Sequence, residues 1–157
     1  DMEILYSDVH PSTRAEEQLG ARKVELTELL VSSDVVTLHT PYLPETHHLI
    51  NEETLRLMKP SAILINVARG KVVDQAALYC ALSQGRIAGA GLDVFEEEPT
   101  TSDNPLFTLQ NVLLTPHAAT STTESLIGMS LVTKDVLAVL QGREPANPVN
   151  RPQSPRH

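Results

Sequence analysis

Several residue types are scarce in this 157-residue chain. Tryptophan is absent, aromatic residues make up 3%, and cysteine occurs once, as Cys80. A single cysteine cannot form an internal disulfide, so a reducing compartment, the cytoplasm, is expected. Cys80 falls within a helical pattern, where a buried and unreactive thiol is expected.

Long apolar runs and an excess of basic residues are also missing. No apolar stretch approaches the roughly 18 residues of a membrane-spanning helix. The first residues, DMEILYSD, lack the basic start and apolar core of a signal peptide. Lysine and arginine number 12 against 20 aspartates and glutamates, a net charge of −8. This balance argues against nucleic acid and against anionic membrane surfaces as partners.

A phosphate-binding glycine loop is missing as well. The one G-x-G of the chain, Gly89 to Gly91, enters an apolar run. The pyrophosphate loop of a dinucleotide site instead leaves a strand and opens a helix. We interpret these glycines as positions of close backbone packing beside a ligand crevice. No metal site is predicted.

Short apolar runs alternate with helix signals along the chain. The runs are nearly continuous and rich in Val, Ile and Leu, which predicts strands buried on both faces of a parallel sheet. Helix starts are indicated at Asn51 and Asp74, and helix ends at Gly20 and Gly85. The predicted fold class is α/β with a mainly parallel sheet. The runs cover residues 4–7, 35–39, 62–67, 88–94 and 112–115.

The C-terminal part has a different pattern. Ser121 and Glu124 form a capping-box pattern before a long helix that ends at Gly142. Its broad apolar face predicts packing on something beyond the sheet, because no strand follows. The predicted organisation is a sheet domain over 1–119, this helix over 120–142 and a tail over 143–157. The final residues 148–157 are expected to fray.

Three segments place one polar residue each just beyond an apolar run. They are INVARG with Arg69, GLDVFEEEP with Glu98, and LLTPHAAT with His117. Each has a structural alternative: a surface salt bridge for Arg69, a solvated acidic run for Glu98 and a structural role for His117. The carboxyl ends of strands are where open α/β sheets place their ligand sites.

The chemistry that these three side chains would share favours the functional interpretation. A carboxylate beside an imidazole favours the protonated ring and fixes its tautomer. The imidazolium can then donate a proton to an oxygen that becomes an alkoxide. A guanidinium can hold a carboxylate through two parallel hydrogen bonds. Together they would suit reduction of a 2-keto acid, given a hydride donor.

Other polar residues give weaker signals. Asp8 ends the first run, where a carboxylate in a dinucleotide site accepts the ribose hydroxyls and favours NAD over NADP. The alternative is an aspartate that begins a turn before Pro11. His47 and His48 are interpreted as surface residues.

With these residues in view, the chain resembles the NAD-dependent D-isomer-specific 2-hydroxyacid dehydrogenase family. The matching segments are DVVTLHTPYLPETHHLI, LMKPSAILINVARGKVVDQAALYCALSQGRIAGAGLDVFEEEP and NPLFTLQNVLLTPHAATSTTES. The similarity runs from about Ile4 to Asn150, and the order and spacing of these motifs are specific to the family.

The resemblance implies roles for individual residues and a Rossmann-type domain that binds NAD. It makes His117 the acid/base, Glu98 its carboxylate partner and Arg69 the anchor for the substrate carboxylate. The helix over 120–142 resembles the one that crosses back to the family's substrate domain. The residues implied in cofactor binding are Asp8, His39, Thr40, Pro41, Val67, Ala68, Arg69, Asp93 and His117.

The chain departs from the family in what precedes residue 4. The family's substrate domain, first strand and GxGxxG loop are not in this sequence, which we interpret as the C-terminal part of an enzyme. In the family's sheet, we expect the first strand to lie between residues 4–7 and 62–67, so that its loss leaves two interior edges unpaired. The resemblance also implies a homodimer for the complete protein.

The resemblance leaves substrate and role open. Glyoxylate, hydroxypyruvate and 3-phosphoglycerate-type acids are the candidate substrates. A non-catalytic binding module is the alternative, because the family includes transcriptional corepressors. A fragment without activity of its own is a third interpretation.

Overall fold

The computed structural model describes residues 2–149, so the fraying expected over 148–157 falls mostly outside the described residues. The chain divides into two compact units, Asp1–His117 and Ala118–His157. The α/β class is confirmed. The helices are α1 Thr13–Leu19, α2 Leu26–Ser32, α3 Glu52–Leu57, α4 Gln75–Ser83, α5 Thr123–Ser130 and α6 Val132–Leu140. The strands are β1 Leu5–Tyr6, β2 Arg22–Lys23, β3 Val35–Leu38, β4 Ile63–Asn66, β5 Gly89–Leu92 and β6 Val112–Leu114.

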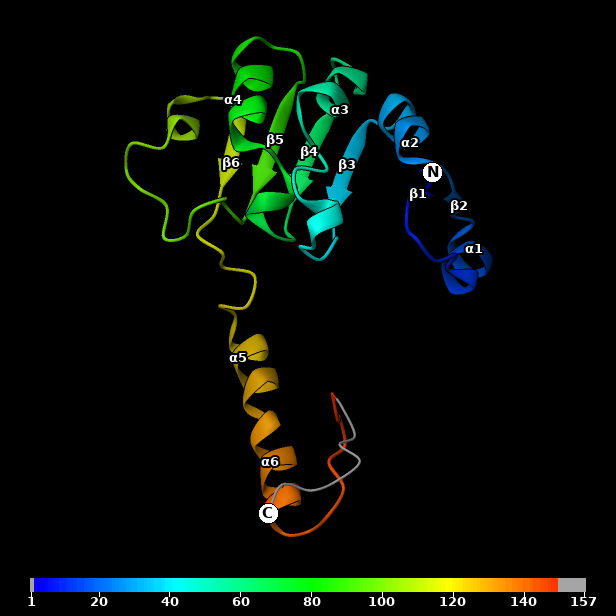
Figure 1. Ribbon diagram of the computed structural model, residues 1–157, viewed down its shortest axis with the longest axis vertical. Coiled ribbons are helices and arrows are strands. Elements are labelled where there is room, and N and C mark those ends of the chain that lie inside the picture. The colour runs from blue at the N-terminus through cyan, green and yellow to red at the C-terminus, as the bar shows by residue number, and fades with distance from the viewer. Residues whose placement is uncertain (1, 150–157) are drawn as a thin grey trace. The chain divides into compact units, whose positions relative to one another are not determined.

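The first unit contains two parallel sheets. Strands β1 and β2 form a two-stranded sheet, and the other sheet has the order β3-β4-β5-β6. In Figure 1 the four arrows of the larger sheet point the same way, so their carboxyl ends share one edge. The short strand β2 was not among the predicted runs.

Capping residues set the limits of the helices as the sequence indicates. The Asn51 side chain accepts hydrogen bonds from the backbone N–H groups of the first turn of α3. The Asp74 side chain accepts one from Ala77 at the start of α4. Gly20 and Gly85 have φ of +64°, the left-handed conformation that ends a helix and favours glycine. These four signals are confirmed.

The larger sheet is buried on one face only. Val36, Leu38 and Leu64 belong to the hydrophobic core beneath α2, α3 and α4. Their neighbours on the opposite face are exposed, Val35 by 53% and Ile63 by 42%. The prediction that these strands are buried on both faces is therefore wrong. Their continuous apolar sequence supplies a second apolar face that no described residue covers.

The open edge of the larger sheet belongs to β3. Strand β4 pairs with β3 on one side and β5 on the other, whereas β3 pairs within the described residues with β4 alone. A further strand therefore has no room beside residues 62–67, and our expectation of its position was wrong. The position that remains is beside β3, because both hydrogen-bonding sides of β4 are occupied.

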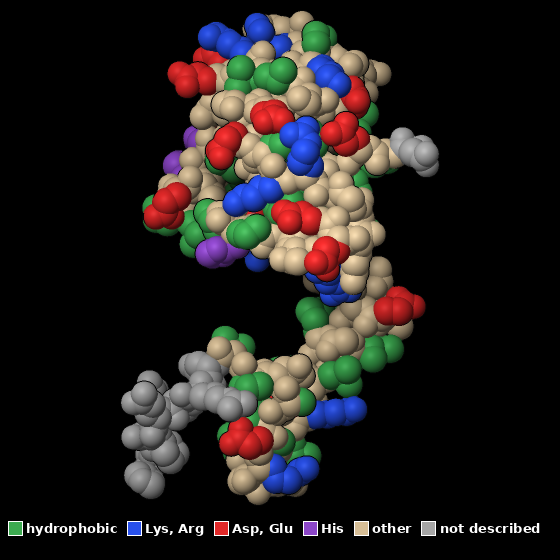
Figure 2. Space-filling view, turned by 90° about the vertical axis from the view of Figure 1, so that its right-hand side faces the viewer, with side chains coloured by type: hydrophobic (Ala, Val, Ile, Leu, Met, Phe, Trp, Pro, Cys, Tyr) green, Lys and Arg blue, Asp and Glu red, His purple; other side chains and the backbone are tan. Residues whose placement is uncertain are grey.

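The second unit consists of helices α5 and α6. They follow one another with only Leu131 between them, in place of the single predicted helix. The helix cap is Thr122, whose side chain accepts from Ser125 N, so the capping box predicted at Ser121 and Glu124 is wrong. Figure 2 shows hydrophobic side chains along this unit, and the exposed ones include Leu126, Ile127, Val132, Val136, Leu137 and Leu140. Within residues 2–149, every helix is too short or too polar to cross a membrane.

The two faces of the sheet predict different costs for neighbouring substitutions. Leu64 is fully buried, so Leu64→Ala should lower the free energy of unfolding by about 2–5 kcal/mol. Ile63 on the open face is the matched control, and Ile63→Ala should cost clearly less. Urea denaturation of the two variants measures the difference. Equal losses would mean that the open face is covered in solution.

Candidate active site

The predicted site residues lie at one edge of the larger sheet. His39 directly follows β3, Arg69 follows β4, Asp93 directly follows β5, and His117 follows β6. Because all four strands are parallel, these residues meet at the carboxyl end, where open α/β sheets bind ligands.

A buried asparagine shapes the turn that carries Arg69. Asn66, 1% exposed, donates from Nδ2 to Arg69 O over 3.0 Å and accepts at Oδ1 from Ala68 N over 3.0 Å. The exposed Arg69 guanidinium donates to Ala68 O over 2.7 Å. The turn is therefore fixed from inside the fold while the guanidinium faces outward.

Gly70 brings this turn into direct contact with the next loop. A Cβ atom at this position would lie 1.8 Å from Phe95 O and 2.4 Å from Glu96 N. Only glycine permits so close an approach between the two backbones. The segment that carries Arg69 therefore packs against the segment that leads to Glu98.

Glu98 and His117 form a direct pair. Glu98 Oε2 lies 2.8 Å from His117 Nδ1, and Glu98 Oε1 accepts from Phe95 N over 2.9 Å. The backbone of His117 has a φ of +53°, in the left-handed region, and its N–H donates to Thr115 O. Both carboxylate oxygens thus have donors, and the pairing leaves Nε2 of the imidazole to meet a ligand.

The surroundings of Glu98 stabilise its charged form. The hydrogen bond with His117 is the largest cause that lowers the pKa of the Glu98 carboxyl, followed by the Phe95 backbone N–H. Burial opposes these two hydrogen bonds and raises the pKa, and the charges of His117 and Arg69 make smaller contributions that lower it. The three predicted side chains therefore belong to one electrostatic group.

Other predicted residues follow strands β5 and β3 at the same edge of the sheet. Asp93 is 8% exposed and accepts at Oδ1 from Thr115 Oγ1 over 2.5 Å. Thr115 was not predicted, although its place at the end of a strand was a usable signal. His39 is exposed, with Nε2 3.0 Å from Thr37 Oγ1, and Thr40 and Pro41 follow it in the same loop.

Three further predicted residues are Val67 and Ala68, in the turn after β4, and Asp8, which follows β1 of the smaller sheet. Val67 is 42% exposed, whereas Ala68 is 8% exposed. Asp8 follows β1 and accepts at Oδ1 from His10 N over 3.0 Å, a local turn that matches the structural alternative. Its role toward a ribose stays a prediction.

One residue that the sequence pattern left as surface has specific partners. His48 is half-buried, and its Nε2 lies 3.0 Å from Glu96 Oε1. Its Nδ1 lies 3.8 Å from Asp74 Oδ2. His48 is still partly exposed, but the sequence pattern did not indicate these two carboxylate partners, because both are distant in the chain. The exposed His47 fits the interpretation as a surface residue.

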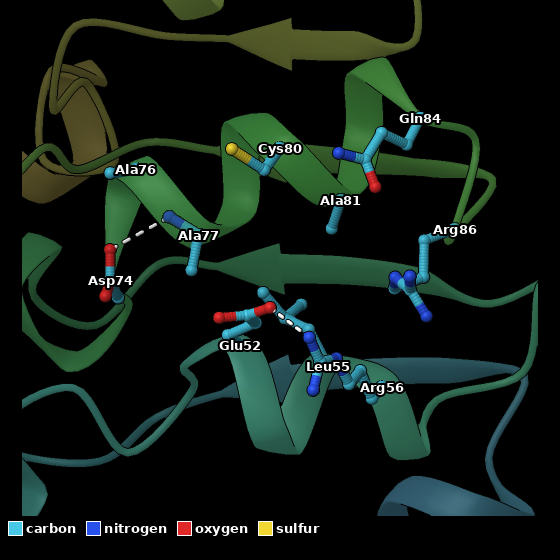
Figure 3. A pocket seen from close by; sticks show the side chains of 10 residues that line it. All are labelled: Glu52, Leu55, Arg56, Asp74, Ala76, Ala77, Cys80, Ala81, Gln84 and Arg86. Carbon is cyan, nitrogen blue, oxygen red and sulfur yellow. Dashed lines mark hydrogen bonds and ion pairs between the residues drawn. The ribbon is translucent and has the colours of Figure 1, made fainter.

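A cavity in the described residues lies away from this site. It measures about 530 Å³ and lies between α3 and α4, with none of Arg69, Glu98 and His117 in its lining (Figure 3). Cys80 lines this cavity and is exposed, so the expectation of a buried thiol was wrong. It lies on the outer side of α4, whereas Leu78, Ala81 and Leu82 of that helix are buried.

Comparison with known families identifies the family to which the first unit belongs. Residues 1–119 match the family model described as "D-isomer specific 2-hydroxyacid dehydrogenase, NAD binding domain". The chain belongs to this family. It is 51% identical to the glyoxylate reductase of Korarchaeum cryptofilum and 50% identical to that of Pyrococcus furiosus. The Korarchaeum comparison covers 96% of this chain and 46% of the relative, and the Pyrococcus comparison 96% and 45%.

Solved structures have the same fold. The TT0316 protein from Thermus thermophilus has a TM-score of 0.87 at 44% identity, over 95% of this chain and 46% of its own. The D-lactate dehydrogenase from Aquifex aeolicus, complexed with NAD and lactic acid, has a TM-score of 0.81 at 42% identity, over 90% and 47%. The Rossmann-type fold is thereby established, and the chain spans about half the length of these relatives.

The pairing of Glu98 with His117 predicts a measurable pKa change. His117→Ala removes the largest cause of the lowered pKa, so the pKa of Glu98 should rise toward its ordinary value. Carbon NMR of the carboxyl group through an acid titration measures it, with His47→Ala as control. A Glu98 pKa unchanged by His117→Ala would contradict the pair.

The same lowered pKa gives a pH dependence of stability. A carboxyl whose pKa is depressed on folding stabilises the folded state fully above its unfolded pKa, and this contribution is lost as pH falls through the folded pKa. The difference in unfolding free energy between wild type and Glu98→Gln should therefore shrink in that acid range. Denaturant unfolding at neutral and acid pH measures it, and a difference independent of pH would contradict the assignment.

Proposed function

We propose that this chain forms the NAD-binding and proton-transferring part of a longer oxidoreductase that interconverts a small 2-keto acid and its 2-hydroxy acid. The observation that carries the proposal is the 2.8 Å contact between Glu98 and His117 beside Arg69, at the carboxyl edge of the sheet. Relatives named glyoxylate reductase support glyoxylate as a substrate. Hydroxypyruvate and 3-phosphoglycerate-type acids are the other candidates.

Each of the three side chains has a task in this proposal. Arg69 binds the substrate carboxylate, since a guanidinium pairs with both of its oxygens. Glu98 holds Nδ1 of His117, so Nε2 is the nitrogen that gives a proton to the keto oxygen or takes it from the hydroxyl. The nicotinamide, when bound, supplies or accepts the hydride at C2 of the acid.

The residues at the sheet edge fit the nicotinamide half of the cofactor. Val67, after β4, has an exposed apolar side chain, and Asp93, directly after β5, has a buried carboxylate. An apolar surface next to a buried acceptor suits a flat ring with a carboxamide group. Asp8 is proposed for the adenosine ribose, and the loop from His39 to Pro41 is proposed to border the cofactor.

We further propose that the rest of the longer protein completes this domain. The unpaired side of β3 would accept a parallel strand, and that strand would carry the pyrophosphate loop. The exposed apolar face of α5 and α6 would pack on the substrate domain. The coverage of about half of each relative supports both statements.

The setting of the proposed enzyme follows from its composition and family. The net charge of −8 supports a small-molecule substrate and no nucleic-acid or membrane partner. The single cysteine supports the cytoplasm. We propose a homodimer for the complete protein. The intact Arg69, Glu98 and His117 group favours catalysis over the alternative of a binding module, which has no use for all three.

A fusion protein tests the activity. The N-terminal half of the Korarchaeum cryptofilum glyoxylate reductase is joined to this chain, and NADH absorbance is followed with glyoxylate and with hydroxypyruvate. His117→Ala should lower kcat by about 10²–10⁴-fold because the proton donor is lost. Arg69→Lys should raise KM more than it lowers kcat, because lysine cannot form the two-point contact.

His47→Ala, an exposed histidine outside the group, is the control and should retain wild-type turnover. Full turnover by the His117→Ala fusion would overturn the catalytic assignment. An inactive wild-type fusion that still binds NAD in calorimetry would favour the binding module.

A further inference from the structure

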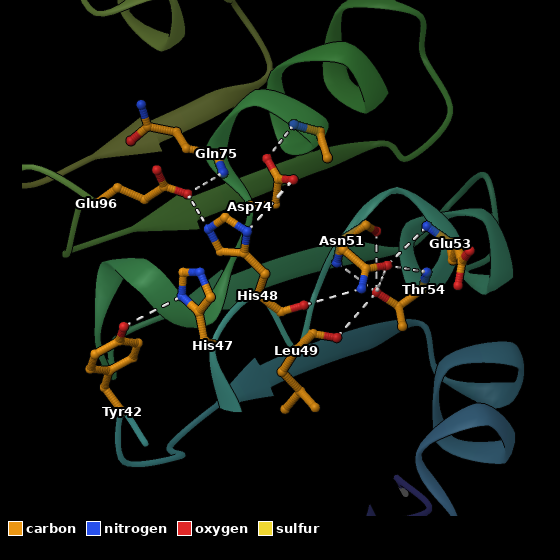
Figure 4. Close-up of polar contacts among 11 residues, drawn as sticks. Tyr42, His47, His48, Leu49, Asn51, Glu53, Thr54, Asp74, Gln75 and Glu96 are labelled. Carbon is orange, nitrogen blue, oxygen red and sulfur yellow. Dashed lines mark hydrogen bonds and ion pairs between the residues drawn. The ribbon is translucent and has the colours of Figure 1, made fainter. Parts of the chain in front are cut away.

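Three chain segments meet at His48, which is not among the residues proposed to touch the substrate. In Figure 4 its imidazole lies between Asp74, at the start of α4, and Glu96, which follows β5. The three side chains are about one-third exposed, so solvent reaches the group.

The backbone of His48 is fixed to the segment that carries Arg69. His48 N donates to Lys71 O over 2.9 Å, and Ile50 N donates to Val72 O over 3.0 Å. Asp74 N then donates to Ile50 O over 2.8 Å, so the two segments pair like parallel strands. The backbone position of His48 is therefore tied by a hydrogen bond to the turn that begins at Arg69.

The side chain of His48 extends this connection to the Glu98 loop. Glu96 Oε1 lies 3.0 Å from His48 Nε2 and accepts from Gln75 N over 2.9 Å. The space between the Gly70 turn and the Phe95–Glu96 backbone holds a cavity of only about 10 Å³. Glu96 is thus held from two sides, and Phe95 directly precedes it.

Phe95 connects Glu96 to the pair formed by Glu98 and His117. Its N–H donates to Glu98 Oε1 over 2.9 Å, and the other oxygen of Glu98 holds His117. A loop that is free to turn at Glu96 would rotate the Phe95 amide away from Glu98. A misplacement of about 1 Å in such a chain can cost about 10²-fold in rate.

We propose that His48 is a positioning residue that locks the Arg69 turn to the Glu98 loop through Glu96. The inference rests on the proposed function for its effect on turnover, but its effect on Glu98 can be measured without it. His48 Nε2 lies within hydrogen-bond distance of Glu96 Oε1, at 3.0 Å, whereas its Nδ1 lies 3.8 Å from Asp74 Oδ2, beyond that distance. A metal ligand would need a lone pair on one of these nitrogens.

The backbone at His48 allows a clean substitution. Its φ is +49°, in the left-handed region, which asparagine tolerates better than most residues. His48→Asn therefore removes the imidazole without forcing the backbone to change. Glu96→Gln is the second variant, because its side-chain oxygen can still accept from Gln75 N while its charge is lost.

His47→Asn is the matched control. His47 stacks on His48 with ring centroids 4.0 Å apart, and its Nδ1 lies 3.5 Å from the Tyr42 hydroxyl. It carries the same substitution at the neighbouring position, and within residues 2–149 it forms no ion pair with a carboxylate.

Two measurements test the proposal. In the 157-residue chain, carbon NMR should show that His48→Asn and Glu96→Gln raise the pKa of Glu98 toward its ordinary value, because the Phe95 N–H is withdrawn. In the fusion protein, both variants should lower kcat about tenfold with a smaller change in KM. His47→Asn should leave both quantities at wild-type values.

The outcomes separate this proposal from the proposed function. A raised Glu98 pKa in an otherwise inactive fusion would support the positioning role and count against the proposed enzyme. A Glu98 pKa that matches the His47→Asn control in both variants would overturn the positioning role, whatever the activity. One-to-one Zn²⁺ binding to the chain, abolished by both variants, would also overturn it, since His48 would then be a metal ligand.

Discussion

The close approach of Gly70 to the backbone of Phe95 is the contact on which the site depends. It brings a turn from the end of β4 against a loop from the end of β5, and each carries one of the proposed side chains. The parallel sheet brings these segments to one edge, but the sheet alone does not fix the distance between them. That distance is set by the absence of a side chain at Gly70.

Around this contact, rigidity comes from polar groups with backbone partners. Asn66 holds the Arg69 turn from inside, and Phe95 N holds Glu98. The charged groups themselves stay partly exposed, as access by a substrate requires. Buried amides thus fix the geometry, while the side chains for which we propose a chemical role stay partly exposed.

The sequence predicts which residues lie at strand ends, but it does not predict contacts that depend on how distant loops and helices pack. Arg69, Glu98 and His117 each follow an apolar run, so the order of runs predicts their common edge. The helix limits at Asn51 and Asp74 follow from local hydrogen bonds, which a short sequence window contains. By contrast, the partners of His48 and the exposure of Cys80 were missed because burial and pairing depend on segments outside that window. The open face of the sheet was misread for a related reason. The apolar residues of a strand do not show whether the segment that packs on them belongs to the same stretch of sequence.

Strand β3 lies at the edge of the larger sheet but lacks the usual features of an edge strand. Edge strands are commonly protected by lysine, proline or a bulge against pairing with other chains. Val35–Leu38 contains no charged residue and no proline, yet one of its sides is unpaired in the described residues. It has the composition of an interior strand at an edge position. The unpaired side of β3 therefore offers a row of backbone N–H and C=O groups with which a strand of another chain can pair.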